Sequence, residues 1–90
     1  MNYLSFTLNY RNSRAVVTVS LSGVESDVML LDSTNLQAFK RRAQFRYVGG
    51  HYRSSPVCLQ VPTNGNWTVV VVPGFGGTVR ASVQVADAAA

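Results

Sequence analysis

The sequence predicts an all-β fold, an antiparallel β-sandwich of about seven strands with one short helical segment near residues 34–42. Three observations support this prediction. Apolar and polar residues alternate over several short runs, as they do in strands that bury one face. Turn-forming residues separate these runs at intervals of roughly eight to twelve residues. Only one stretch, which follows a cluster of capping residues, has apolar residues at helical spacing.

The N-terminal third of the chain contains three predicted strands. Residues 3–8 and 15–21 alternate strictly, so each is expected to bury one face, with a turn at 9–13 between them. A polar break at 25–27 follows the second strand. Residues 28–31 are apolar on both faces, which is typical of an internal strand.

The helical segment near residues 34–42 begins after two residues that favour helix N-termini, Asp32 and Ser33. It is too short to be stable alone. We therefore expect it to pack on the sheet through Leu36 and Phe39, which are three positions apart.

The middle of the chain contains two further predicted strands. Residues 44–48 alternate, and Gly49-Gly50 is expected to end that strand. Residues 55–61 form the next strand, with Pro56 at its beginning or on a sheet edge. Asn64-Gly65 then predicts a hairpin turn, because both central positions of a type I′ turn need positive φ.

The last two strands are the clearest in the sequence. Residues 67–72 are apolar on both faces after Thr68, and residues 78–85 alternate strictly. The glycine-rich segment 73–77 between them is interpreted as the turn of a hairpin. It lacks the lysine and the helix that follow a phosphate-binding loop.

Length and composition limit the class of protein. Ninety residues indicate a single domain, placed at 1–85, with a frayed tail at 86–90. Hydrophobic residues make up 47% and charged residues 13%, which excludes a disordered chain. The N-terminus lacks a signal-peptide pattern, the longest aliphatic run is far too short to span a membrane, and Cys58 is the only cysteine. We therefore expect a cytoplasmic protein that does not contact a membrane.

Residues that could support catalysis are few. His51 and Cys58 are single, and a thiol in the middle of a strand is typically an inert small hydrophobe. The four acids are scattered, so neither paired catalytic carboxylates nor metal-ligand spacing is present. The sequence thus predicts a protein that is not an enzyme and has no metal and no cofactor.

The best functional candidate is the stretch 39–53, where aromatic residues are interleaved with basic ones. The net charge is +4, and residues 40–53 contain five Lys and Arg but no acid. Aromatic rings stack on bases and arginines contact phosphates, so a nucleic-acid or polyanion binder is one hypothesis. An anionic ligand or an acidic protein partner is a second, and a solvated basic face beside core aromatics is a third. The candidate binding residues are Arg41, Arg42, Arg46, Tyr47, His51, Tyr52 and Arg53.

A homodimer is also expected, because a sandwich has open sheet edges and this chain has few lysines or prolines that would block strand pairing.

Several short motifs together resemble a small bacterial all-β family that is known as a domain of unknown function. The matching segments are residues 30–36 (Leu-Leu-Asp-Ser-Thr-Asn-Leu), 45–51, 55–57, Pro62, 65–67 and 77–83. The chain departs from the family pattern at Val48, Asn66 and Val72. The resemblance implies a compact β domain, found alone or attached to other domains such as TIR-like ones, and it brings no catalytic residues. A looser resemblance, through residues 30–32 and 65–70, is to non-catalytic accessory domains at the ends of secreted proteases.

These observations favour a non-catalytic binding or interaction module of a bacterial protein. The alternative is a nucleic-acid or polyanion binder that uses residues 39–53.

Overall fold

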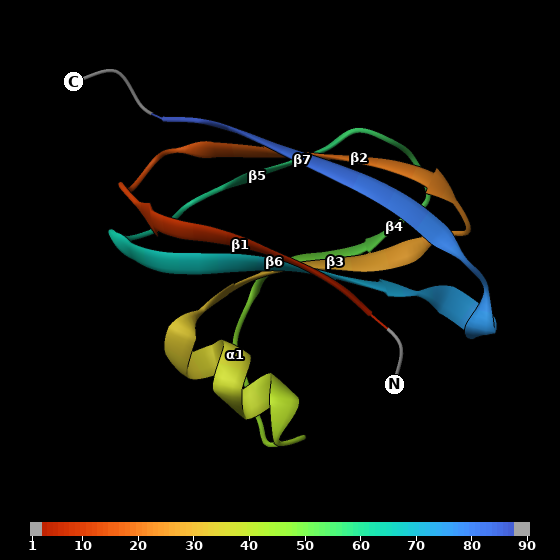
Figure 1. Cartoon of the computed structure of the whole chain (residues 1–90), viewed down its shortest axis with the longest axis horizontal. Helices are drawn as coiled ribbons and strands as arrows, with labels where there is room; N and C mark the ends of the chain where they lie inside the picture. The colour runs from red at the N-terminus through yellow and green to blue at the C-terminus, as the bar shows by residue number, and fades with distance from the viewer. Residues whose placement is uncertain (1–2, 88–90) are drawn as a thin grey trace.

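The computed structural model describes residues 3–87, apart from the side chain of Phe75. Two antiparallel sheets pack face to face, and one helix lies on the outer face of the larger sheet (Figure 1). The predicted all-β sandwich of seven strands with one short helix is confirmed. The elements are β1 (Leu4–Arg11), β2 (Val16–Gly23), β3 (Ser26–Asp32), α1 (Ser33–Lys40), β4 (Val48–Tyr52), β5 (Val57–Gln60), β6 (Gly65–Pro73), the 3-10 turn η1 (Gly74–Gly76) and β7 (Val79–Ala86).

The larger sheet has the strand order β1-β6-β3-β4, and the smaller has the order β5-β2-β7. Every neighbouring pair is antiparallel. The two strands at the centre of the larger sheet, β3 and β6, are those whose sequences are apolar on both faces. The predicted internal positions of residues 28–31 and 67–72 are thus confirmed. No helix among the described residues is long and apolar enough to cross a membrane.

Two apolar layers hold the fold together. Between the sheets lie fully buried residues from both, including Val17, Val19, Leu30 and Val69. A smaller cluster on the outer face of the larger sheet joins side chains of β3 and β6 to α1. The predicted helix anchors are confirmed in that cluster, where Phe39 is buried and Leu36 is half-buried.

Of the two predicted capping residues, Asp32 and Ser33, it is Asp32 that caps α1. Its carboxylate accepts a hydrogen bond of 2.8 Å from the backbone N–H of Asn35, which satisfies one of the free donors at the helix start. The helix ends at Lys40, two residues before the predicted end.

The two predicted hairpins are wrong. The Asn64-Gly65 segment connects β5 of the smaller sheet to β6 of the larger one, and residues 73–77 lead from β6 back to β7 of the smaller sheet. The reason is the position of β6. β6 is apolar on both faces, as is typical of an internal strand, and it pairs with β1 on one side and β3 on the other, so neither of its edges is free for β5 or β7.

The predicted strand at 44–48 is also wrong. Residues 44–47 are irregular, and β4 begins at Val48 and includes Gly49 and Gly50, which were expected to end it. Gly49 has φ of 137°, and a Cβ there would overlap the carbonyl oxygen of Val28 on the neighbouring strand. This glycine therefore permits close strand pairing instead of breaking the strand.

Several boundaries differ from prediction by one or more residues; for example, the strand predicted at 55–61 is the shorter β5, Val57–Gln60, which begins after Pro56 and ends before Pro62. β1 continues through the expected turn at 9–13 as far as Arg11, by way of a bulge after Thr7 where Asn9 has φ of 61°. The expected break at 25–27 is partly strand, because Ser26 begins β3 and its buried hydroxyl donates to the Val24 carbonyl. At the C-terminus, β7 extends to Ala86; the rest of the predicted tail, after Asp87, lies outside the described residues.

Two adjacent glycines of β4 give the first testable prediction. Gly49→Ala is expected to lower the free energy of unfolding by about 2 kcal/mol or more, because the new Cβ meets backbone and φ is positive. Gly50→Ala is the matched control, since a Cβ there meets nothing within 4 Å, and its effect is expected within about 0.5 kcal/mol. Urea denaturation measures both, and equal losses would contradict this explanation of β4.

Candidate ligand-binding hollow beside the helix

The outer face of the larger sheet is only partly covered by α1. After the helix, the chain turns sharply at Arg42, which has φ of 60°. Two backbone hydrogen bonds fix this turn, from Arg42 N–H to the Phe39 carbonyl and from Ala43 N–H to the Ala38 carbonyl, at 3.1 and 2.9 Å. The chain then runs back toward β4 through residues 43–47. This returning segment and the end of α1 form two walls above the exposed part of the sheet.

A row of four aromatic rings begins at Tyr3, just before β1, and continues along these walls. The ring centroids of Tyr3 and Phe39 are 5.2 Å apart, those of Phe39 and Phe45 are 5.3 Å apart, and both pairs meet edge to face. Phe45 and Tyr47 follow at 5.7 Å with tilted planes. Edge-to-face contacts stabilise a defined arrangement of rings, so the row fixes the otherwise irregular segment against the helix. Tyr47, at the end of the row, is 48% exposed.

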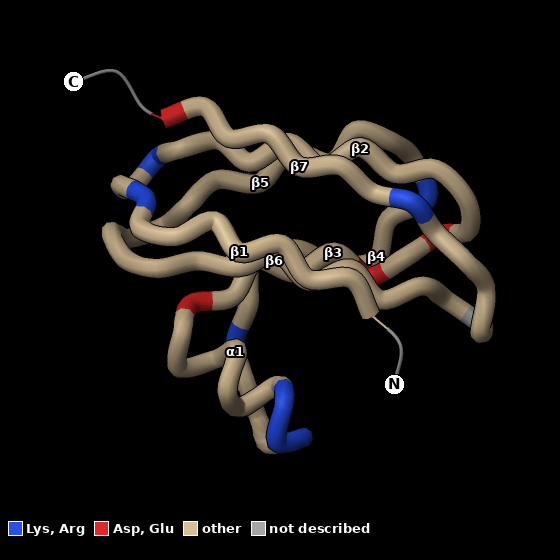
Figure 2. Tube along the Cα trace, in the orientation of Figure 1, with Lys and Arg blue, Asp and Glu red and all other residues tan. Residues whose placement is uncertain are grey.

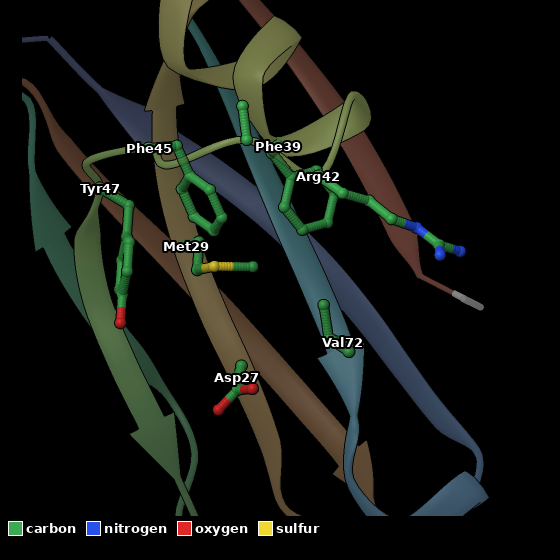
Figure 3. A pocket seen from close by; sticks show the side chains of 8 residues that line it. Asp27, Met29, Phe39, Arg42, Phe45, Tyr47 and Val72 are labelled. Carbon is green, nitrogen blue, oxygen red and sulfur yellow. The ribbon is translucent and has the colours of Figure 1, made fainter.

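The walls and the sheet enclose an open hollow of about 590 Å³. This volume is within the usual range of small-molecule sites. Met29 of β3 lies at its centre, below the rings of Phe39 and Phe45, and Val72 of β6 forms the floor beside it (Figure 3). Tyr47 borders one side. The complete lining is Asp27, Met29, Phe39, Arg42, Ala43, Phe45, Tyr47 and Val72.

The polar groups of the hollow lie at its rim. Asp27 is at one end, and Arg42 is at the other, where its guanidinium extends away from the apolar centre (Figure 3). Arg42 forms no ion pair with any residue in the described range 3–87. A ligand with an apolar body could therefore place an anion near this guanidinium without displacing an internal partner.

A second, smaller hollow of about 340 Å³ lies on the other side of Tyr47. Trp67 contributes to its lining, and its indole N–H donates to the Thr63 carbonyl at 2.9 Å. Arg46 also lines it and is held through its backbone N–H, which donates to the Asn35 side-chain oxygen at 2.7 Å. Tyr47 is thus shared by two adjoining hollows.

A cluster of four charged side chains lies next to the larger hollow, at one end of β3 and β4. His51 Nδ1 is 2.8 Å from Asp27 Oδ1, and its Nε2 is 3.5 Å from Glu25 Oε2. Arg53 Nε is 2.9 Å from the same Glu25 oxygen. Asp27 and His51 are direct cross-strand partners, so the strand register itself brings them together. The hydrogen bond to Asp27 raises the pKa of His51, and the charge of Glu25 adds to the effect.

The seven candidate residues predicted from the sequence do not form one surface. Arg41 and Arg42 follow α1, while Arg46 and Tyr47 lie on the returning segment beside the two hollows. His51 and Arg53 are paired with acids, and the half-buried Tyr52 packs against the core between the sheets. The basic positions along the chain accordingly form separate groups, one of them at the C-terminal end of α1 (Figure 2).

Three residues of the hollow were not among the predicted binding residues: Met29 and Val72 of the floor, and Asp27 of the rim. The sequence does indicate that the outer face of the sheet is apolar, because residues 28–31 and 67–72 are apolar on both faces and so require cover on both. A helix with only two apolar anchors, Leu36 and Phe39, is too small to cover the whole outer face of these two strands.

His51 and Cys58 lie on strands of different sheets. His51 contacts acids of the same sheet, and Cys58 is exposed on β5 of the smaller sheet, 4.0 Å from the Thr18 hydroxyl. Within the part of the chain that the structure describes, no group of three or more His, Cys, Asp or Glu could hold a metal ion.

The chain matches the model of a known protein family. A family model described as a domain of unknown function (DUF1883) matches residues 1–89. No curated protein and no solved structure is significantly similar to the chain.

The charged cluster gives the second prediction. Because the pKa of His51 is raised above its ordinary value of 6.5, its pairing stabilises the fold fully below pH 6.5. This stabilisation is lost as the pH rises through the folded-state pKa. His51 is the only histidine, so its ring protons can be followed through a pH titration by NMR.

Asp27→Asn is expected to bring the pKa of His51 back toward 6.5 and to remove most of the pH dependence of the unfolding free energy in this window. Glu25→Gln is the comparison variant and is expected to have the smaller effect, because its oxygen is 3.5 Å from the ring. A His51 pKa that is unchanged in Asp27→Asn would show that the 2.8 Å contact does not persist in solution.

Proposed function

We propose that this chain, which belongs to the DUF1883 family of domains of unknown function, is a non-catalytic binding module of a bacterial cytosolic protein. The observation that carries the proposal is the open hollow beside α1, with its apolar centre and aromatic walls. The ligand is a compact apolar group, such as a ring or a branched side chain, joined to an anion. It belongs to a protein partner or to a small molecule.

The apolar part of this ligand is inferred from the lining. Met29 and Val72 form an apolar floor. Val72 is half-buried and Met29 is 6% exposed, so transfer of an apolar group onto the part of this floor that still meets water is favourable. The thioether of methionine adapts to different shapes and makes favourable contacts with rings. Three rings, those of Phe39, Phe45 and Tyr47, already surround this position, so a further apolar group gains contacts on several sides.

The anionic part is inferred from the basic end of the hollow. Arg42 lies on the rim, and its neighbours Lys40 and Arg41 are exposed at the end of α1. None of the three forms an ion pair with a residue between 3 and 87. Asp27 at the opposite end is already paired with His51, so it competes only weakly for the arginines.

The non-catalytic part of the proposal rests on the residue types that line the hollow. The two charged residues that line the hollow are Arg42 and Asp27, and Asp27 is paired with His51. Acyl transfer or hydrolysis would require a nucleophile beside a base, and among the described lining residues there is neither serine, threonine, cysteine nor histidine.

The geometry is less favourable to the nucleic-acid hypothesis. Single-stranded nucleic acid needs several free arginines along one groove and ring faces open for stacking. Here Arg53 pairs with Glu25, and the rings of Phe39 and Phe45 pack against each other. Salt distinguishes the two hypotheses, because one arginine–anion contact gives a shallow salt dependence and several phosphate contacts give a steep one.

The third prediction concerns a matched set of three probes: 2-naphthylacetate, its neutral amide and acetate. Naphthylacetate is expected to bind with Kd on the order of 1 mM, the amide more weakly, and acetate not measurably. Backbone and methyl NMR titrations measure the affinity and locate the site. The expected shifts are centred on Met29, Phe45, Tyr47 and Val72.

Two variants separate the apolar and ionic contributions. Tyr47→Ala is expected to weaken naphthylacetate and its amide alike, by about threefold to tenfold, because a wall of the hollow is lost. Arg42→Gln is expected to weaken only the acid, by about twofold to fivefold, because the amide has no charge to pair.

The chain offers a matched control for each variant. Tyr10, on β1, is 60% exposed and does not line the hollow, and Arg14 shares with Arg42 an exposed side chain and a positive φ, of 70° against 60°. Tyr10→Ala and Arg14→Gln are expected to leave all three affinities unchanged. If they weaken binding as much as Tyr47→Ala and Arg42→Gln do, the hollow is not the site.

A further inference from the structure

Each of the two sheets has two open edges, and three of these four edges carry features that oppose the addition of another strand. β1 has a bulge after Thr7. β4 has only five residues and includes Gly49 with positive φ. β5 has only four residues and lies between Pro56 and Pro62.

The fourth edge, β7, has none of these features. It is eight residues long and pairs with β2 from Val79 to Ala86 without any shift in register. It contains neither proline nor glycine, and Arg80 is its one charged residue. Within residues 3–87 no strand pairs with its outer side, so the backbone donors and acceptors on that side are free.

The inner face of β7 is also incompletely covered. Val79, Ala81, Val83 and Val85 pack against the core, but each is only half-buried, whereas Val17 and Val19 of the adjacent β2 are 0% exposed. β1 lies across from β7 at the same side of the sandwich and contacts it (Figure 1). Its Leu4 and Phe6 are half-buried as well. A continuous apolar seam therefore runs between β1 and β7.

We propose that β7 pairs antiparallel with β7 of a second copy of this chain, with the two Ser82 residues opposite each other on the twofold axis. With a twofold axis perpendicular to the sheet, each residue of β7 lies opposite a residue of the second copy whose side chain points to the same face of the sheet. In this register Val79 meets Val85 of the partner copy, and Ala81 meets Val83. The inward-facing apolar side chains of the two β7 strands thus form one continuous row. This row covers the apolar seam between β1 and β7 in each copy.

The charges on β7 favour a second copy of the chain as the pairing partner. On the outer face, Arg80 meets Gln84 of the partner copy, whose amide oxygen can accept from the guanidinium. Like charges never face each other across the axis, because Arg80 lies two positions away from it. The strand is thus complementary to itself, which is what an isologous interface requires.

The pairing has a consequence for binding, although it does not rest on the proposed function. The two smaller sheets join into one continuous sheet, and both larger sheets then lie on the same side of it. The two hollows, which are on the outer faces of the larger sheets, consequently face the same direction. Such a dimer is able to engage a bivalent partner with increased avidity.

A charge exchange at Ser82 tests the proposal. Ser82 is exposed on the outer face, where its neighbour on β2 is Ser20, so a charged side chain is compatible with the fold. Ser82→Lys or Ser82→Asp places two like charges on the axis, and each variant alone is expected to weaken the dimer by about tenfold or more. An equimolar mixture of the two variants pairs opposite charges and is expected to restore the dimer.

Sedimentation velocity from about 10 μM to 1 mM measures the assembly, with a monomer mass of 9.8 kDa. Ser20→Lys is the matched control: it adds the same charge one strand away from the edge and is expected to leave the dimer intact. Circular dichroism and the urea midpoint show that the monomeric variants are folded. The proposal is overturned if the wild type is monomeric throughout this range, if Ser82→Lys dimerises like the wild type, or if the mixture stays monomeric.

Discussion

The structure depends on one constraint, which is that the central strands of the larger sheet must be covered on both faces. β3 and β6 have fully buried residues pointing in both directions, such as Leu30 and Leu31, or Val69 and Val70. The smaller sheet covers the inner face of these strands. α1 covers the outer face through Phe39 and Leu36. β6 pairs with β1 and β3 at its two edges, and the chain crosses to the smaller sheet both before and after it.

The hollow is a direct consequence of the lengths of these elements. An eight-residue helix is about 12 Å long, whereas the nine-residue β6 extends about 30 Å. The helix therefore cannot cover the strand that it packs on. The aromatic row that ends in Tyr47 extends the cover beyond the helix; beneath it Met29 is 6% exposed and Val72 is only half-buried, and both line the hollow. The proposed site is thus the part of a two-faced sheet that the chain itself does not cover.

Much of this fold follows from the sequence, because alternation and two-faced apolar runs determine which residues point inward. What the sequence does not determine is which sheet a strand joins. Asn64 illustrates this: its side chain accepts a hydrogen bond from the backbone N–H of Ser13, in the β1–β2 turn, at 2.6 Å instead of closing a hairpin. Gly49 illustrates a second ambiguity, since glycine both ends strands and permits close pairing. For the site, composition identified Arg42 and Tyr47, but Asp27, Met29 and Val72 come together only through the register of β3 with β6.

The most direct test of this account is whether a bound ligand contacts Met29. The ε-methyl group of this residue lies at the centre of the hollow, and the methyl groups of Val71, on the opposite face of the same sheet, provide an internal reference. Intermolecular nuclear Overhauser effects measured with naphthylacetate, and later with the natural ligand, should connect the ligand ring protons to the Met29 methyl and not to Val71. Contacts that instead locate the ligand near Arg53 or Trp67, with none to Met29, would contradict the account.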